Sequence, residues 1–257
     1  MPIYQAIVLG IVQGLTEILP ISSSGHLILV PQIFGWAPHS LSFDAALHLG
    51  TAAALLVFFS RDWISLLVER QWRTIAAIAL ASVPVGLLGL FWEDFIGQNF
   101  RGGTLVAGAL VLVAVLMLVV ERWYRRGSTK RKNLTVPDIL AVGLAQALAL
   151  VPGVSRSGIT ILTGMGRGIE RAAAARFSFI ISLPIVFAAG FWEVFSVYRD
   201  GVLANDWSSF AVGIATSFVV GLFAIKLLFR VLERFSLIPF AVYRILLGAT
   251  LLLSLLV

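Results

Sequence analysis

The sequence contains no cysteine and few charged residues. With none among its 257 residues, disulfide bridges, thiolate metal sites and a cysteine nucleophile are all excluded. Aspartate, glutamate, lysine and arginine together make up 12% of the chain, where soluble domains usually carry about 25%. Hydrophobic residues make up 59%. A chain this poor in charge cannot form a water-soluble surface, which predicts an integral membrane protein.

The charges that are present are mostly positive, with 19 lysines and arginines against 13 aspartates and glutamates. The densest basic stretch runs from Arg122 to Lys132, and other basic residues flank the apolar runs. Basic clusters at the ends of apolar segments are typical of cytoplasmic loops in membrane proteins. We therefore expect the lipid bilayer as a partner of this chain and no nucleic acid.

Long apolar runs predict six helices that cross the membrane, because about 20 apolar residues span a hydrocarbon core. These runs cover about 42–60, 74–92, 103–122, 174–197, 208–230 and 238–257. Two further apolar regions, 3–35 and 138–168, are interrupted at 20–25 and 152–158 by proline, serine and glycine, which break helices. The pieces after each break are too short to cross. Each region is therefore predicted to form a re-entrant hairpin of two half-helices.

The two interrupted regions resemble each other at a constant spacing of 133 residues. Gly10 and Gln13 match Gly143 and Gln146, and the serines and glycine of 22–25 match those of 155–158. Three crossings per half place the second half upside down, as in many transporters. The predicted fold is an all-α polytopic membrane protein, one domain over 1–257, with six transmembrane helices and two re-entrant half-helix hairpins in two inverted-topology repeats. Repeat 1 covers about 1–122, a basic cytoplasmic linker about 123–136, and repeat 2 about 137–257.

The remaining charges predict an orientation, because lysine and arginine favour the cytoplasmic side. With the linker inside, the cytoplasmic side also receives Arg61, Arg70, Arg73, Arg167, Arg171, Arg176, Lys226, Arg230 and Arg234. The opposite side receives Glu93, Asp94, Arg101, Arg199, Asp200 and Asp206, together with both termini. The two hairpins are then expected to enter from opposite faces, with their tips meeting near the middle of the bilayer.

A half-helix that begins at such a break presents unpaired N–H groups and the positive end of its dipole, which together bind anions. The groups expected to bind substrate oxygens there belong to Ser22, Ser23, Ser24, Gly25, Ser155, Ser157, Gly158 and Thr160. Arg156 adds a planar guanidinium suited to two-point contact with phosphate. An arginine within the membrane costs about 3 kcal/mol or more, which favours a functional role.

Glu17 ends the first apolar half-helix, where the helix dipole disfavours a carboxylate. A divalent cation, Arg156 or a proton is expected to compensate its charge. Gln13 lies one turn earlier on the same face of the helix and is expected to contact the substrate. The sequence leaves these three forms of compensation open.

Two histidines follow in positions suited to chemistry. His26, three residues after Ser23, is a candidate general acid or base, or a nucleophile. Asp44 and His48 form an i,i+4 pair at the start of the next span. Their spacing fits a substrate-binding role and fits a local hydrogen bond equally well.

At these residues the sequence resembles the undecaprenyl-diphosphate phosphatase family, the bacitracin-resistance type of bacterial lipid-recycling enzyme. The motifs are Gln13-Gly-Leu-Thr-Glu17, Pro20-Ile-Ser-Ser-Ser-Gly-His26 and Pro152-Gly-Val-Ser-Arg-Ser-Gly-Ile-Thr160, and the similarity covers essentially the whole chain. Gln13 stands where members carry glutamate or glutamine, and Ser24 where threonine is frequent. The resemblance implies hydrolysis of undecaprenyl diphosphate to the monophosphate and inorganic phosphate. It also implies a bacterial inner-membrane location, an active site open to the periplasm, and a divalent cation, Mg²⁺ or Ca²⁺, at Glu17.

The favoured mechanism combines these two lines of argument. Ser23 attacks the terminal phosphorus, Glu17 and His26 manage the proton and the metal, and Arg156 with the half-helix amides stabilises charge on the phosphate oxygens. Attack by His26 and attack by an activated water are the rival mechanisms. A transporter or flippase of a lipid phosphate on the same scaffold is the competing class, and a purely structural role leaves Glu17 and Arg156 unexplained. The sequence does not fix the oligomeric state, and a homodimer is one option.

Overall fold

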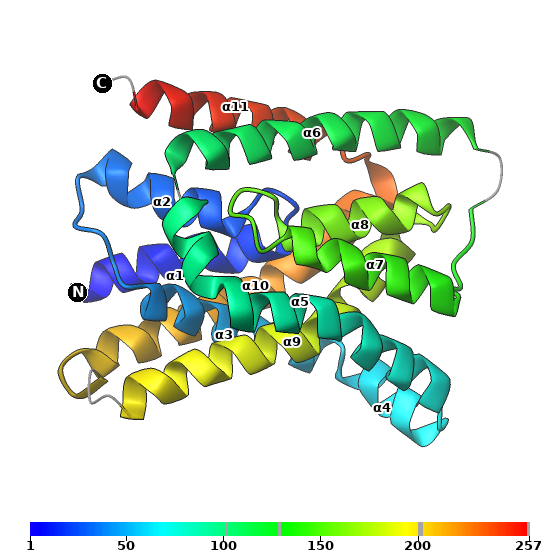
Figure 1. Cartoon of the computed structure of the whole chain (residues 1–257), viewed down its shortest axis with the longest axis horizontal. Coiled ribbons are helices and arrows are strands. Elements are labelled where there is room, and N and C mark those ends of the chain that lie inside the picture. The colour runs from blue at the N-terminus through cyan, green and yellow to red at the C-terminus, as the bar shows by residue number, and fades with distance from the viewer. Residues whose placement is uncertain (101, 128–129, 200–202, 256–257) are drawn as a thin grey trace.

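The computed structural model describes residues 1–100, 102–127, 130–199 and 203–255, which fold into eleven helices without a β-strand (Figure 1). The helices are α1 (Ile3–Ile18), α2 (Ser23–Phe34), α3 (Leu41–Phe58), α4 (Ser60–Val68), α5 (Trp72–Asn99), α6 (Gly103–Arg126), α7 (Val136–Leu148), α8 (Arg156–Gly166), α9 (Arg171–Arg199), α10 (Leu203–Arg234) and α11 (Ile238–Ser254). Of the charges used to predict the orientation, Arg101, Asp200 and the side chains of Glu93 and Asp94 lie outside the described residues.

Five helices of the described part are long and apolar enough to cross a bilayer, and they match five of the six predicted spans. Their apolar segments are Leu41–Phe58, Trp72–Phe91, Gly103–Arg126, Arg171–Trp192 and Asp206–Arg234. The sixth predicted span forms α11, whose 17 residues lie at the lower limit of a crossing helix, so that its crossing stays a prediction. Helix α4 was not predicted, because its nine residues mix Arg61 and Asp62 with apolar side chains and contain no long apolar run.

Both interrupted regions fold as pairs of short helices joined by a tight connection. We call residues 19–22, between α1 and α2, the first turn, and residues 149–155, between α7 and α8, the second turn. Ser22 and Ser155, at matching repeat positions, have φ angles of +74° and +71°. Such angles are uncommon outside glycine. The backbone of the two turns therefore follows the same match that the sequence shows.

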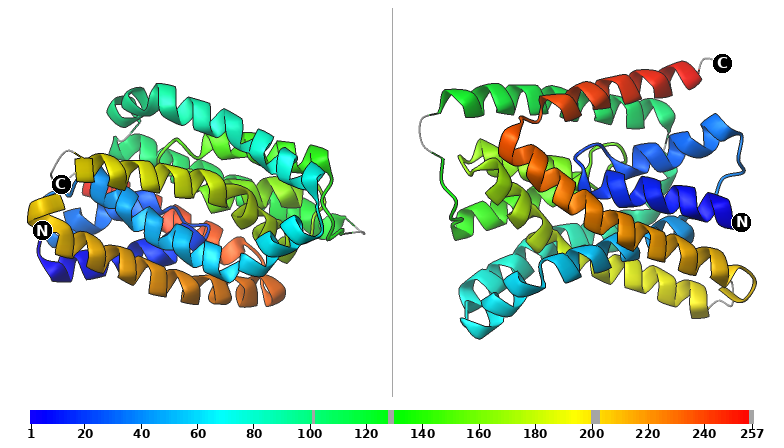
Figure 2. Two further views of the ribbon diagram at one scale, coloured as in Figure 1. Left: turned by 90° about the horizontal axis from the view of Figure 1, so that it is seen from below. Right: turned by 180° about the vertical axis from the view of Figure 1, so that it is seen from behind.

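The two pairs approach each other from opposite ends of the molecule. Figure 1 shows α1 and α2 extending inward from the end that holds both termini, and α7 and α8 from the end where α6 and α7 are connected. The views in Figure 2 again place both termini at one end. Helix α1 packs on α10 and α7 packs on α5, while α3 lies against α9 and α10. The two turns thus come to lie in the interior, between the long helices.

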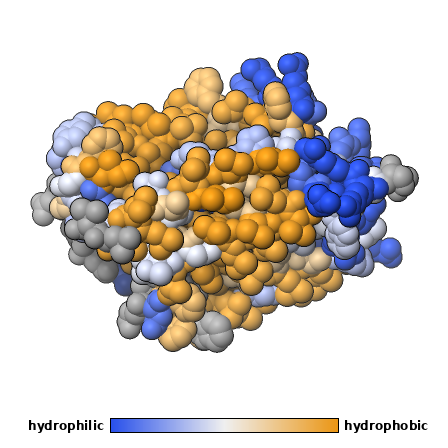
Figure 3. All heavy atoms as spheres, turned by 90° about the horizontal axis from the view of Figure 1, so that it is seen from above, coloured by the Kyte–Doolittle hydropathy of each residue, from blue (hydrophilic) through white to orange (hydrophobic). Residues whose placement is uncertain are grey.

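The surface has an apolar belt and one strongly hydrophilic end. Large apolar side chains face outward along the helices, among them Leu90 and Phe91, which are 74% and 78% exposed. On the face drawn in Figure 3, hydrophilic residues gather at the end where α6 and α7 are connected, and apolar residues cover the middle. This distribution is that of a protein whose sides contact lipid rather than water.

Candidate active site

The carboxylate of Glu17, near the end of α1, is where side chains from four helices meet. Ser23 Oγ donates a hydrogen bond to Glu17 Oε2 at 2.7 Å, and Arg156 Nη2 donates to Oε1 at 2.7 Å. His48 Nε2 lies 3.3 Å from Oε2, and Gln13 Nε2 donates to the same oxygen at 3.3 Å. The glutamate is only 7% exposed. A hydroxyl, a guanidinium and an imidazole therefore share one buried carboxylate.

The contact between His48 and Glu17 requires a shared proton. His48 Nδ1 lies 2.7 Å from the main-chain carbonyl of Asp44, which can only accept, so Nδ1 carries a hydrogen. A second proton, on His48 Nε2 or on the Glu17 carboxyl, is then needed for their contact to be attractive. Because the His48 side chain is 32% exposed, it also reaches toward the outside of the cluster. The pair can store and exchange a proton next to Ser23.

Arg156, the first residue of α8, uses two of its three nitrogens within the cluster. Nη1 donates to Ser182 Oγ and Nη2 donates to Glu17. Its Nε is buried without a hydrogen-bond partner among the described residues. The guanidinium carbon lies 6.0 Å from the centre of the Phe179 ring. Arg156 is thus held between Glu17 and α9, and a phosphate that binds to its Nη2 edge has to compete with the Glu17 carboxylate.

Reciprocal hydrogen bonds join the two turns. Ser24 Oγ accepts from the Gly153 N–H at 3.1 Å, and Ser157 Oγ donates to the Leu19 carbonyl at 3.3 Å. Ser24 and Ser157 occupy matching positions of the two halves, so each half holds the turn of the other in a similar way. These two serines, predicted to bind substrate, therefore also hold Ser23 close to Arg156.

The other predicted binding residues have local partners. Ser155 Oγ accepts from the Gly158 N–H at 3.2 Å and caps α8. Ser22 Oγ contacts Ser24 Oγ at 3.1 Å, and a Cβ placed on Gly25 would lie 3.4 Å from Leu110. Thr160 Oγ1 bonds the Arg156 carbonyl at 2.7 Å and Ser178 Oγ at 2.5 Å, between α8 and α9. Their part in binding substrate remains a prediction.

His26, the candidate acid, base or nucleophile, contacts a main-chain carbonyl and a tyrosine hydroxyl. Its Nδ1 lies 2.7 Å from the Ser22 carbonyl and its Nε2 lies 2.8 Å from the Tyr243 hydroxyl. Since the carbonyl can only accept, Nδ1 carries the hydrogen, and a neutral His26 accepts from Tyr243. Ser23 donates to Glu17, and Glu17 in turn contacts His48. The ring nitrogens of His26 are directed at the Ser22 carbonyl and the Tyr243 hydroxyl instead.

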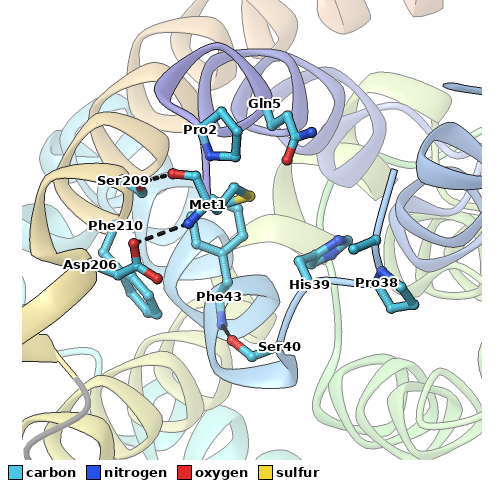
Figure 4. Close-up of a pocket in the computed structure, with 11 residues that line it drawn as sticks. Met1, Pro2, Gln5, Pro38, His39, Ser40, Phe43, Asp206, Ser209 and Phe210 are labelled. Carbon is cyan, nitrogen blue, oxygen red and sulfur yellow. Dashed lines mark hydrogen bonds and ion pairs between the residues drawn. The ribbon is translucent and has the colours of Figure 1, made fainter. Parts of the chain in front are cut away.

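Asp44 is linked to the outer surface. Its Oδ1 lies 2.5 Å from His39 Nε2, and His39 lines a cavity of about 470 Å³ at the end of the molecule that holds the N-terminus. Figure 4 shows His39 on one side of this cavity and Asp206, paired with the Met1 amino group, on the other. Asp44 therefore connects the cavity wall with the turn of α3 that carries His48.

Glu17 and Gln13 carry oxygen atoms of the chemical kind that divalent cations take as ligands. No group of three or more histidine, aspartate or glutamate side chains is placed to hold a metal within the described ranges. However, Gln13 Oε1, one turn from Glu17, is buried without a hydrogen-bond partner there. One carboxylate and one amide oxygen are hard ligands of the kind that Mg²⁺ and Ca²⁺ take, and Mg²⁺ commonly completes its shell with substrate phosphates and water.

Comparison with known proteins shows the family of this chain. The family model described as bacitracin resistance protein BacA matches residues 6–250. The chain belongs to this family. It is 44% identical to the undecaprenyl-diphosphatase of Desulforudis audaxviator, covering 96% of this chain and 95% of that protein. It is 40% identical to undecaprenyl-diphosphatase 2 of Stutzerimonas stutzeri and 42% identical to the undecaprenyl-diphosphatase of Geobacter sulfurreducens, each over 98% of both chains.

For this member of the BacA family, sequence reasoning missed several residues that complete the site. Ser182 and Tyr243 carry no signal, because a serine or tyrosine within an apolar helix is common. Arg244 carried one: like Arg156, it is an arginine in an apolar segment. The Arg244 side chain is fully buried and so does not extend toward the membrane surface, as arginines near the ends of apolar segments can.

Proposed function

We propose that this chain hydrolyses undecaprenyl diphosphate to undecaprenyl phosphate and inorganic phosphate. One observation carries the proposal: the Ser23 hydroxyl lies 2.7 Å from Glu17, whose other oxygen holds Arg156. A nucleophile, a base and a phosphate-binding cation thus meet in one buried cluster. The names of its relatives in the BacA family support the substrate. The reaction returns the lipid carrier to cell-wall synthesis and confers resistance to bacitracin.

In the proposed mechanism Ser23 Oγ attacks the terminal phosphorus while its proton passes to Glu17. The bond between that phosphorus and the bridging oxygen breaks, undecaprenyl phosphate leaves, and a phosphoserine remains. Arg156 moves its Nη2 contact from Glu17 to the phosphate oxygens and stabilises their charge. Glu17 gives the Ser23 proton to the departing undecaprenyl phosphate. A water molecule then attacks the phosphoserine, Glu17 with His48 takes a proton from this water, and the bond between phosphorus and Ser23 Oγ breaks. Ser23 Oγ regains a proton from Glu17, and inorganic phosphate is released. Glu17 and Gln13 would hold a divalent cation, which would neutralise charge on the phosphate oxygens when bound.

The proposed setting of this reaction is the bacterial inner membrane, with six crossings and two inverted repeats of which α1–α2 and α7–α8 are the re-entrant hairpins. Three features support it: the similar φ angles of Ser22 and Ser155, the reciprocal bonds of Ser24 and Ser157, and the opposite directions of the two pairs in Figure 1. The joined turns then lie near the middle of the bilayer. The site opens to the periplasm, on the side of the termini.

Phosphate release in detergent tests the function directly. The purified chain, supplied with undecaprenyl diphosphate and Mg²⁺, is expected to release inorganic phosphate in micelles, and Ser23→Ala is expected to release none. Ser65→Ala, in the exposed helix α4, is the control and should match the wild type. The reciprocal bonding of the two halves also favours a lipid-phosphate flippase, which needs two membrane sides. A chain that is silent in micelles but moves lipid phosphate across vesicles would be that flippase.

A further inference from the structure

Arg244 in α11 is a fully buried arginine whose partners are main-chain carbonyls. It is 0% exposed. Its Nη2 donates to the carbonyls of Gly153 at 2.7 Å and Val154 at 3.1 Å, and its Nη1 donates to the carbonyl of Pro20 at 3.3 Å. Its Nε donates to the Leu110 carbonyl at 3.2 Å. One guanidinium thus reaches the first turn, the second turn and α6.

The chemistry of these partners distinguishes Arg244 from a structural ion pair. A buried charge is normally balanced by an opposite charge, because an unpaired one is costly. No carboxylate lies in salt-bridge contact with Arg244 in the part of the chain that the structure describes. Instead of a carboxylate, several converging carbonyl dipoles balance the charge of Arg244. The planar guanidinium has five N–H groups and can donate to several carbonyls at once. The carbonyls of Pro20, Gly153 and Val154 would otherwise be under-satisfied at breaks in two helices.

These carbonyls lie just ahead of the groups that react. Pro20 precedes Ser23 by three residues, and Gly153 precedes Arg156 by three, so the two contacts are equivalent in the two halves. Fixing both carbonyls on one rigid group fixes the spacing of α2 and α8, whose first turns carry Ser23 and Arg156. The neighbouring Tyr243 holds His26 from the same helix. Helix α11 therefore contacts both turns from one side.

We propose that Arg244 is a positioning residue that braces the two turns, so that Ser23 and Arg156 can act on the same phosphate. This inference rests on the proposed phosphatase function. The brace acts through the placement of Arg156 and of the N-terminal ends of α2 and α8, and Arg244 itself does not touch the phosphate. Loss of the brace should lower kcat and weaken phosphate binding, because a shift of about 1 Å at a reacting group costs roughly 100-fold in rate.

The test compares Arg244→Met, Arg244→Lys and the control Leu251→Ala. Leu251 is fully buried in an apolar cluster whose members belong to α2, α6 and α11 and none to the two turns, so its truncation is expected to loosen packing alone. For each folded variant we would measure the unfolding temperature, kcat, KM and the inhibition constant of inorganic phosphate. Arg244→Met is expected to lower kcat by about 100-fold and to weaken phosphate inhibition by about tenfold or more. Leu251→Ala should lower the unfolding temperature and leave both constants close to wild type.

Arg244→Lys separates the brace from the charge. Lysine keeps the positive charge but offers a single ammonium in place of the fork, so it cannot span both turns, and it is expected to stay well below wild-type kcat. Wild-type kcat and phosphate inhibition in Arg244→Lys, or in folded Arg244→Met, would overturn the proposal. Should Arg244→Met fail to fold, Arg244→Lys decides alone. If the wild type releases no phosphate, the proposed function fails, and ³¹P titration of inorganic phosphate still compares the binding site of the variants.

Discussion

The Glu17 carboxylate has more partners than one base needs, and they differ in what they do. Ser23 gives it a proton to accept, Arg156 balances its charge, and His48 shares a proton with it. The arrangement resembles other activated hydroxyl nucleophiles, in which a base next to the hydroxyl is itself oriented by a third group. Of the two histidines considered from the sequence, His48 rather than His26 lies beside that base.

Trapping the intermediate tests the nucleophile. Ser23→Ala should abolish turnover while the inhibition constant of inorganic phosphate changes little, because the anion site is built mainly from other groups. Rapid acid quench of the wild type should yield a phosphoenzyme that is stable in acid and labile in base, as phosphoserine is. The opposite lability would identify phosphohistidine and give His26 the role of nucleophile. Full activity in Ser23→Ala would remove this residue from the chemistry.

His48→Gln tests the proton store. The variant keeps a side chain of similar reach but cannot hold the shared proton, so kcat should fall by about 100-fold, the lower range for a lost acid–base group. Asp44→Asn is the matched control, because His48 bonds the main-chain carbonyl of Asp44, which the substitution retains. Its kcat should stay within a few-fold of wild type. Equal losses in both variants would place the role in the Asp44 side chain instead.

Among the helices, close approach depends on small residues at matching positions. A Cβ placed on Gly10 would lie 2.8 Å from Thr216 Cβ on α10, and one on Gly143 would lie 2.3 Å from Ala81 Cβ on α5. Carbon atoms this close repel, so neither helix can carry a side chain there without moving. Helices α1 and α7 lead into the two turns. The packing of α1 on α10 and of α7 on α5 therefore determines the positions of the turns.

Gly143→Ala is therefore expected to destabilise the protein by about 2 kcal/mol, the usual cost of overpacking, and to lower activity by displacing the second turn. Thermal unfolding and phosphate release measure the two effects. Gly108→Ala is the control, because no heavy atom lies within 4 Å of a Cβ built at this mid-helix position of α6. That change should be neutral or slightly stabilising, since alanine favours helix over glycine. Equal stability of the two variants would refute the close-packing argument.

The sequence predicted the elements near the site better than their contacts. The breaks at 20–25 and 152–158 are local, so the two turns could be located from proline, serine and glycine alone. The Arg156–Glu17 contact was anticipated as one form of charge compensation. The hydrogen bonds between Gly153 and Ser24 and between Tyr243 and His26 join residues 129 and 217 positions apart. They depend on how separate helices pack, which no local pattern encodes.

At the scale of the whole molecule, the two ends differ in charge. Ion pairs with a buried carboxylate stabilise the basic end, where α6 and α7 are connected. Asp138 at the start of α7 is 0% exposed and accepts hydrogen bonds from Arg131 and from Arg167 at 2.5 Å each. The hydrogen bonds from Arg131 first, then from Arg167, hold the pKa of Asp138 well below its usual value of 3.8. This cluster ties the connection between α6 and α7 to the end of α8.

Low pH should destabilise the end of the molecule that contains Asp138. Because the folded pKa of Asp138 is depressed, its stabilisation is fully present above about pH 4 and is lost as the pH falls toward the folded pKa. Asp138→Asn should lower the unfolding temperature at pH 7 by about 5 °C, and the difference from wild type should shrink below pH 4. Tryptophan fluorescence on heating provides the measurement. Glu170→Gln, an exposed neighbour at 3.7 Å from Lys132, should change little at any pH.

The orientation can be tested because the chain has no cysteine of its own. Lys130→Cys should resist an impermeant thiol reagent in intact cells, since the α6–α7 connection is predicted to be cytoplasmic. A cysteine at Tyr4, near the opposite end, should be labelled. Permeabilised cells supply the control for reactivity, and both positions should react there. Labelling of position 130 in intact cells would reverse the predicted orientation.

The Arg156–Glu17 contact also bears on how a hydrolase can distinguish its substrate from the phospholipids that surround it. Each surrounding lipid presents a phosphodiester, which carries one negative charge and is flanked by bulky groups on both sides. In the proposed mechanism, a terminal phosphate with two charges competes for Arg156 far better, and its arrival releases Glu17 to accept the Ser23 proton. Recognition thereby switches on the base, as in induced fit. The enzyme is then inactive toward the phospholipids that surround it and becomes active only when a lipid with a terminal phosphate binds.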